Sequence, residues 1–303
     1  MAWRLHLTNQ AINQLNILDD LLGIWVRRDR VIYHTLDTGT QYGETVLIPP
    51  DTTDRQSELW LSFVTELVAP NDQFLPFVQL PQMTLHITND GRMRLYHDNA
   101  NGLFLDTDGR EVTLDAGKTI EFTTVALDRF LGLIAALDEN GQMHIFQQHI
   151  RVGAFDLKLN MDLDARPQIA ITSGGGSIFV TDSRKLVLTD SGGRTRKSLD
   201  LAYDVRQMAC SPDGKYLVTC DMEIGLIRVY DGKSLTLIYQ RFAIDLMAHA
   251  TQVQLIADMP PVFVAPSALT INNDGMIAFA MSGVICVTDL SHMDELPRPQ
   301  TLF

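Results

Sequence analysis

The clearest structural signal in this chain is the segment Ser211-Pro212-Asp213-Gly214-Lys215-Tyr216-Leu217-Val218-Thr219-Cys220. It places a tight Asp-Gly turn directly before an apolar strand, and a further strand follows at Gly225-Leu226-Ile227-Arg228-Val229-Tyr230-Asp231-Gly232. Asp-Gly steps favour β-hairpins because these residues tolerate the positive φ angles of a tight turn. The same plan returns six times along the 303 residues, so the chain is predicted to consist of repeated β-units.

The other five units combine an apolar strand, a Gly-rich or Asp-containing turn and two more strands. They occupy residues 17–34, 88–106, 126–146, 169–188 and 268–287. Each unit is expected to form four antiparallel strands, A to D. In the unit at 88–106, Asp90-Gly91 aligns with Asp213-Gly214 and is expected to form the turn between strands A and B, while residues 102–106 align with strand C.

Strand C of most units ends at an aspartate beside a Gly or Ser. An aspartate at this position can cap the following C–D turn by accepting hydrogen bonds from its backbone, so a structural role is predicted. These residues are Asp37, Asp106, Asp190, Asp231 and Asp289.

The last unit lacks a fourth strand of its own, because residues 294–303 are Pro-containing and irregular. Trp3, Leu5 and Leu7 alternate with polar residues before the first complete unit begins. We expect this N-terminal strand to serve as strand D of the last unit. Such an arrangement closes a ring, removes exposed strand edges and brings the two termini together.

Residues 211–219 and 227–231 resemble the blades of bacterial WD-repeat-like and YVTN-like β-propellers. Tyr230-Asp231 stands where the Trp-Asp dipeptide of the WD family would lie, and the Gly-His element is missing. The resemblance implies an all-β protein in which residues 1–303 form a single β-propeller domain. Six blades are the simplest count, and seven are the alternative if the first insertion described below contains an irregular extra blade.

Two insertions, residues 49–81 and 242–266, interrupt the repeat between strand D of one unit and strand A of the next. Both are expected on one face of the propeller, and both contain a predicted helix. The second helix is predicted over residues 246–258, with Asp245 as its cap and Pro260-Pro261 as its stop. The first is predicted within residues 57–67, where one face would carry Leu59, Trp60, Phe63, Val64 and Leu67.

These insertions have two interpretations. They either pack over the blades and complete the core, or form a rim that binds a partner, since insertions on rigid scaffolds often carry recognition. On the second interpretation, the partner-binding residues are predicted to be Trp60, Phe63 and Leu67.

The net charge of −13 disfavours binding to nucleic acid or to an anionic membrane, which requires a basic surface. The two basic clusters, residues 27–30 and 194–197, are short, lack interleaved aromatic residues and fall at predicted turns. No apolar run is long enough to span a membrane, and the N-terminus does not resemble a signal peptide. A cytoplasmic protein is therefore expected.

No motif for catalysis, a metal or a cofactor is evident. The eight histidines are scattered, and only His144 and His149 are close in sequence. Cys210, Cys220 and Cys286 lie in apolar strands without Cys-x-x-Cys spacing, so they are predicted to be core thiols. Gly174-Gly175-Gly176 opens no helix, and residues 106–109 form only half of a calcium-binding loop. The prediction is no catalytic residue, no metal and no cofactor.

The sequence leaves three functions open. The favoured one is a non-enzymatic scaffold that binds a protein partner through one decorated face. The second is a lactonase-type propeller hydrolase with a site at the channel mouth, with or without a metal, for which Asp20, Asn89 and Asn272 are the candidate residues. The third is a propeller that binds a small molecule or a glycan.

Overall fold

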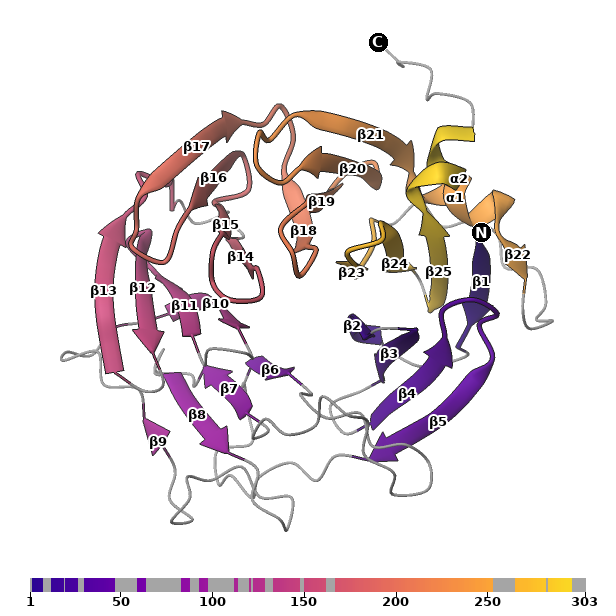
Figure 1. Ribbon diagram of the computed structural model, residues 1–303, viewed down its shortest axis with the longest axis horizontal. Coiled ribbons are helices and arrows are strands. Elements are labelled where there is room, and N and C mark those ends of the chain that lie inside the picture. The colour runs from indigo at the N-terminus through magenta and orange to yellow at the C-terminus, as the bar shows by residue number, and fades with distance from the viewer. Residues whose placement is uncertain are drawn as a thin grey trace. The chain divides into compact units, whose positions relative to one another are not determined.

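The structure is a computed structural model, and it divides into two compact units (Figure 1). The first unit comprises Met1–Glu44 with Leu199–Phe303, and the second comprises Thr45–Ser198. The residues described are 2–7, 12–18, 20–26, 30–46, 59–63, 83–87, 93–97, 112–113, 120, 122–128, 133–147, 150–161, 167–252, 265–281 and 283–295.

Most of the described residues lie in β-strands and the two helices are short, which confirms the predicted all-β class. In the first unit, two four-stranded antiparallel sheets and one five-stranded sheet are present. Their strands, in sheet order, are β2 (Ile12–Leu18), β3 (Leu21–Val26), β4 (Arg30–Thr35) and β5 (Gln41–Val46); β18 (Val205–Cys210), β19 (Tyr216–Asp221), β20 (Leu226–Asp231) and β21 (Leu237–Phe242); and β22 (Thr251–Gln252), β1 (Trp3–His6), β25 (Val284–Asp289), β24 (Met276–Met281) and β23 (Ala268–Ile271).

The second unit contains three four-stranded antiparallel sheets, each in simple sequence order. Their strands are β6 (Leu59–Phe63), β7 (Met83–Ile87), β8 (Met93–His97) and β9 (Val112–Thr113); β10 (Phe122–Asp128), β11 (Leu133–Asp138), β12 (Gln142–Gln147) and β13 (Ile150–Asp156); and β14 (Gln168–Ile171), β15 (Ile178–Thr181), β16 (Lys185–Thr189) and β17 (Thr195–Asp200).

The sheets of each unit pack side by side, mainly through their first strands; β7, the second strand of its sheet, is the exception. In the first unit β23 contacts both β2 and β18, and in the second β10 contacts both β7 and β14. The core lies between neighbouring sheets, and the second strands β11 and β15 are buried along their whole length. This explains why these strands read as continuous apolar runs rather than as alternating ones, since both of their faces are covered.

The N-terminal strand completes the last sheet, as predicted. β1 pairs antiparallel with β25, with Trp3 opposite Val287 and Leu5 opposite Ile285. The outer edge of β1 is covered in turn by β22, which pairs with it in parallel. The strand β22 was not predicted, and its presence leaves β1 internal to its sheet.

Trp3 connects this last sheet to the first one. Its indole Nε1–H donates a hydrogen bond to the Leu36 carbonyl oxygen at 2.7 Å, and the side chain is buried. Leu36 and Gly39 belong to the turn between β4 and β5, and Gly39 has a φ of +67°. A Cβ atom on Gly39 would lie 2.8 Å from the Trp3 ring, so the indole packs directly against this turn.

Aspartates organise two sets of turns. The predicted C–D caps are confirmed for Asp37, Asp190 and Asp231, each of which accepts backbone N–H hydrogen bonding within its turn. Asp289 is followed by helix α2 instead of a C–D turn, and it accepts the His292 N–H of that helix. Asp106 lies outside the described residues. A second set was not predicted: at the turns after strand B, three buried carboxylates accept two backbone N–H bonds each, those of Asp138, Asp182 and Asp221.

The strands of the second repeat were predicted one position too early in their sheet. Residues 83–87 and 93–97 were expected as strands A and B, but β6 lies before them in the sheet and makes them its second and third strands. The expected strand C at 102–106 lies outside the described residues. An Asp-Gly step marks a hairpin without indicating which hairpin of the sheet it joins, and this explains the error.

Both predicted helices are wrong in their bounds or type. Residues 59–63, predicted as helix, form strand β6, paired antiparallel with β7. The helix α1 spans Ala243–His249 rather than 246–258, and Asp245 lies in its first turn without capping it. Three residues of α1 are buried in the core of the first unit, which favours the interpretation that this insertion completes the core: Ala243, Leu246 and Met247.

The Trp3 contact predicts unequal effects of two glycine substitutions. Gly39→Ala introduces both a positive-φ alanine and a clash with the Trp3 ring, whereas Gly174 has a φ of +82° and open space around it. Gly174→Ala is expected to cost about 1 kcal/mol of unfolding free energy, and Gly39→Ala about 1–3 kcal/mol more. Urea denaturation measures both values. Equal losses for the two variants would show that the packing of Trp3 against Gly39 contributes nothing.

The buried His34 predicts a specific loss of stability in acid. Burial lowers the pKa of His34 below its ordinary 6.5, and the hydrogen bond between Nδ1 and the Gly39 carbonyl oxygen offsets only part of this effect. The unfolded chain therefore takes up a proton near pH 6.5 that the folded chain resists, so stability is lost as the pH falls below this value.

Thermal unfolding between about pH 8 and about pH 5 tests this expectation. The stability advantage of the wild type over His34→Gln is expected to shrink as the pH falls. The exposed His249 provides the matched control, His249→Gln. A difference between wild type and His34→Gln that does not change with pH would contradict the assignment.

Candidate functional site

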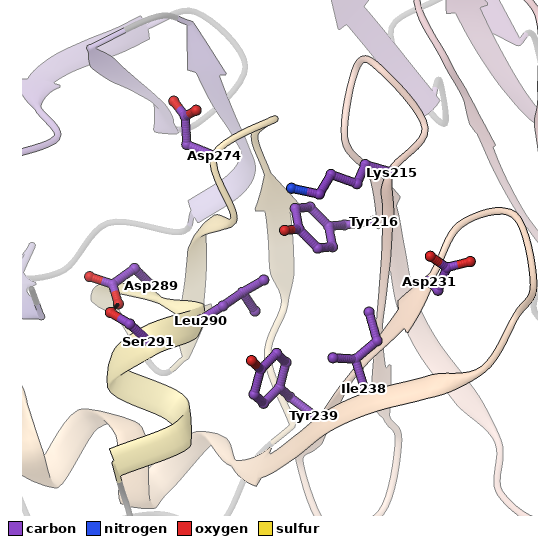
Figure 2. A pocket seen from close by; sticks show the side chains of 9 residues that line it. All are labelled: Lys215, Tyr216, Asp231, Ile238, Tyr239, Asp274, Asp289, Leu290 and Ser291. Carbon is purple, nitrogen blue, oxygen red and sulfur yellow. Dashed lines mark hydrogen bonds between the residues drawn. The ribbon is translucent and has the colours of Figure 1, made fainter.

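In the first unit, the turns of two neighbouring sheets enclose an open groove of about 460 Å³ (Figure 2). One side comes from the sheet β18–β21, and the other from β24, β25 and the helix α2 (Leu290–Glu295) that follows β25. The residues that line it are Lys215, Tyr216, Asp231, Ile238, Tyr239, Asp274, Asp289, Leu290 and Ser291.

The turn between β18 and β19 positions Lys215 and Tyr216. Ser211 Oγ donates to Asp213 Oδ1 at 2.7 Å, and the same carboxylate oxygen accepts the Lys215 N–H at 2.9 Å. The Asp213 N–H donates to Asn273 Oδ1 at 2.9 Å, which ties this turn to the equivalent turn of the next sheet. The Asp-Gly segment thus holds the two walls of the groove together.

The turn between β20 and β21 packs on top of this hairpin. Asp231 Oδ1 accepts hydrogen bonds from the Ser234 N–H, the Ser234 hydroxyl and the Lys233 N–H, and these bonds lower the pKa of Asp231. The Gly232 N–H donates to the Lys215 carbonyl oxygen at 2.8 Å. A Cβ atom on Gly232 would overlap the Gly214 carbonyl oxygen, so only glycine permits this approach.

The opposite wall is built in the same way. Asp289 Oδ1 accepts hydrogen bonds from the Ser291 hydroxyl and the His292 N–H, and so stabilises the start of α2. The Leu290 N–H donates to the Gly275 carbonyl oxygen at 3.2 Å. Gly275 has a φ of +81°, and its Cα faces the Leu290 side chain closely, since an added Cβ would lie 2.7 Å from it.

The groove combines three carboxylates with one ammonium group. The Lys215 Nζ lies 4.6 Å from the centre of the Tyr216 ring and extends across the groove (Figure 2). Contact with Tyr216 raises the pKa of Lys215, and the carboxylates of Asp213 and Asp274 raise it further. Asp274 is exposed, and its carboxylate makes no hydrogen bond to the described residues.

An apolar rim borders the groove along β21. Leu237 and Ile238 are 43% and 41% exposed, and Ile238 and Tyr239 line the groove itself. These two aliphatic side chains are among the most exposed large apolar ones in the described part of the chain. Carboxylates, tyrosine rings and exposed aliphatic side chains therefore meet at one place.

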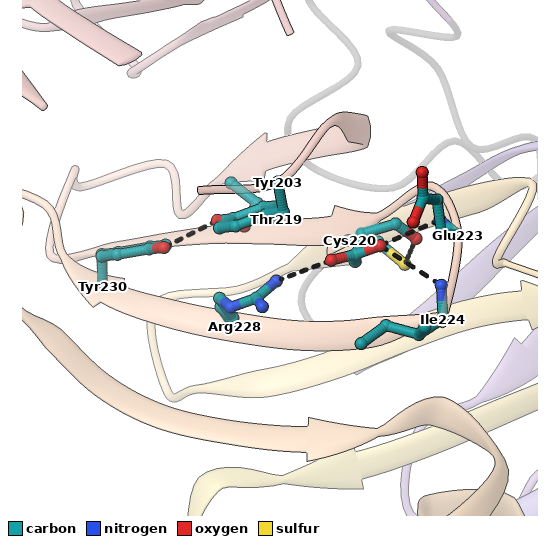
Figure 3. A network of polar contacts seen from close by, with 8 residues as sticks. Tyr203, Thr219, Cys220, Glu223, Ile224, Arg228 and Tyr230 are labelled. Carbon is teal, nitrogen blue, oxygen red and sulfur yellow. Dashed lines mark hydrogen bonds and ion pairs between the residues drawn. The ribbon is translucent and has the colours of Figure 1, made fainter. Parts of the chain in front are cut away.

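A separate polar network runs along strands β19 and β20 of the sheet β18–β21 (Figure 3). The Tyr203 hydroxyl is 2.6 Å from the Tyr230 hydroxyl and 2.9 Å from Thr219 Oγ1. The guanidinium of Arg228 stacks 3.6 Å from the Tyr203 ring centre, and its Nη1 is 3.3 Å from Asp221 Oδ2.

This network has a structural role. Burial raises the pKa of Tyr203 and of Tyr230, so both phenols stay protonated and neither is an activated base or nucleophile. Tyr230, the residue at the Trp-Asp position, instead anchors the segment that carries Tyr203, which connects to strand β18.

Two of the partner-binding residues predicted from the sequence, Trp60 and Phe63, lie in strand β6 of the second unit rather than on a helix. The helical spacing that grouped them therefore does not apply. Leu67 lies outside the described residues, and binding by these three residues stays a prediction.

Two of the residues considered for a lactonase-type site, Asp20 and Asn272, lie at hairpin turns of the described part of the chain. Asp20 is exposed in the turn between β2 and β3, and Asn272 Oδ1 accepts the N–H groups of Asp274 and Met276. Asn89 lies outside the described residues. His144 Nε2 is 3.1 Å from Asp138 Oδ2 in a buried pair, while His149 lies outside the described residues.

Among the described residues, no group of three His, Cys, Asp or Glu side chains is placed to hold a metal ion. In the same part of the chain, no helix has both the length and the apolar character that crossing a membrane requires. Models of known protein families give no match to this chain, and no curated protein matches it.

The groove was not predicted from the sequence. Asp231 and Asp289 were recognised, but only as turn caps, and Lys215 only as part of the repeat. The available signal was the concentration of aspartates at turns beside Tyr216 and Tyr239. The packing of two sheets decides which of these turns become neighbours, and the local sequence does not indicate it.

Proposed function

We propose that this chain is a six-bladed β-propeller that acts as a non-enzymatic scaffold for a protein partner. The six sheets found among the described residues support the blade count. The first and last sheets of the chain also contact each other through β2 and β23, as ring closure requires. In the proposed ring, the pairing of β1 with β25 joins the N-terminal strand to the last blade.

In this proposal, the groove is the surface that binds the partner. Tyrosine rings and aliphatic side chains with a polar border are typical of protein interfaces, where tyrosine is enriched among the residues that dominate binding. Tyr216, Tyr239 and Ile238 provide this chemistry on rigid strands. Asp231 and Asp289 beside them are engaged in turn hydrogen bonds rather than in a paired acid–base arrangement, which favours recognition over catalysis.

The net charge supports the choice of partner. A chain with a charge of −13 is repelled by phosphate backbones and by anionic lipid surfaces, whereas a protein with a basic surface is attracted to it. We therefore propose that the partner is a protein rather than a nucleic acid or a membrane. The proposed location is the cytoplasm, as expected from the sequence.

Site-specific cross-linking tests this function. A photoreactive amino acid at position 238 is expected to cross-link a partner protein, which is then purified for binding measurements. Ile238→Asp should weaken the affinity for that partner by about tenfold or more, because removing a central apolar contact costs at least about 1.4 kcal/mol. The thermal midpoint should stay near that of the wild type.

Two further variants locate the contact. Val152, 57% exposed on β13, provides the matched control Val152→Asp, which is expected to bind normally. The double variant Trp60→Ala with Phe63→Ala tests the surface predicted from the sequence. Normal binding by Ile238→Asp would contradict the proposed groove, and loss of binding in the double variant without loss of stability would assign the contact to β6 instead.

A further inference from the structure

The groove already holds a cation from the chain itself. The Lys215 ammonium lies over the Tyr216 ring in the geometry of a cation–π contact, at 4.6 Å from the ring centre. Its side chain is exposed, and it forms no ion pair with any described residue. The lysine is therefore held by an aromatic face and by the field of nearby carboxylates rather than by a fixed salt bridge.

The carboxylates of the groove outnumber this cation. Asp231 and Asp274 both line it, so one lysine leaves an excess of negative charge. Asp213 adds a further carboxylate at the edge of the same hairpin, where it contributes to the electrostatic environment of Lys215. The groove therefore attracts a second cationic group even while Lys215 occupies it.

We propose that the groove binds a lysine or arginine side chain of a partner protein segment, and that this side chain displaces Lys215 from the Tyr216 ring. The inference rests on the proposed scaffold function and specifies the chemistry of its contact. Apolar residues beside the basic one would pack on the rim formed by Leu237 and Ile238. Lys215 then acts as an internal competitor that weakens binding of cations to the groove.

Displacement is chemically easy. An exposed lysine regains its hydration when it leaves the ring, so little is lost on the protein side. Arginine has the additional advantage that its planar guanidinium stacks on a tyrosine ring while it bonds to a carboxylate. The chain itself contains such a pairing, since Arg228 stacks on Tyr203 and contacts Asp221.

The test uses a defined probe, the fluorescein-labelled peptide Leu-Arg-Leu with blocked ends, and an analogue with citrulline in place of arginine. Citrulline keeps the shape of arginine but carries no charge. Fluorescence anisotropy is expected to show saturable binding of the arginine peptide that weakens with salt, and binding of the citrulline peptide about tenfold weaker or worse.

Matched variants assign the effect to the groove. Asp274→Asn is expected to weaken binding of the arginine peptide about fivefold, whereas Asp190→Asn, at a turn that does not line the groove, is expected to leave it unchanged. Lys215→Met should strengthen binding about threefold or more, while Lys197→Met makes the same charge change outside the groove and should not.

Several results would overturn the inference: no saturable binding of the arginine peptide, equal binding of the citrulline peptide, or an unchanged affinity in Asp274→Asn. Weaker binding by Lys215→Met would show that this lysine assists binding, and would overturn its proposed role as an internal competitor. The scaffold function is tested by a different experiment, the effect of Ile238→Asp on binding of the cross-linked partner, so the two proposals can fail independently. A partner that needs Ile238 but tolerates Asp274→Asn would retain the function and refute the cation chemistry.

Discussion

The pairing of β1 with β25 is the constraint on which the rest of the first unit depends. Without β1, the amide groups along the outer edge of β25 would have no strand partner. The same strand carries Trp3, whose indole bonds to Leu36 and packs on Gly39 in the first sheet. A short strand at the start of the chain therefore holds together sheets formed by both ends, and β25 leads directly into the wall of the groove.

In the groove that we propose as the binding site, the residues that stabilise the fold also line the surface. Asp231 and Asp289 stabilise turns by accepting backbone hydrogen bonds, and their carboxylates also line the space between two sheets. Gly232 and Gly275 let neighbouring chain segments approach closely enough to form its walls. A binding surface of this kind needs no dedicated insertion, because the repeat places charged turns side by side wherever two sheets meet.

The sequence predicted the features that depend on local chemistry. The hairpin at Asp213-Gly214, the capping role of Asp231 and the pairing of the N-terminal strand all follow from turn residues and alternation. The predicted helix at residues 57–67 was wrong over residues 59–63, because in so short a run Leu59, Trp60 and Phe63 fit a helical period while Leu59, Leu61 and Phe63 fit a strand period. The groove could not be predicted, because Asp213 and Asn273 are 60 residues apart and meet only through sheet packing.

A disulfide between β1 and β25 tests the central pairing most directly. Arg4 lies opposite Cys286 in the strand register, on one face of the sheet, at a spacing that cross-strand disulfides require, about 4.4–6.8 Å between Cα atoms. Arg4→Cys is expected to form this disulfide under mild oxidation, detected by peptide mapping, whereas His6→Cys, opposite Val284, is expected not to. A disulfide to Cys286 from position 6 but not from position 4, or from neither, would contradict the pairing on which the structure rests.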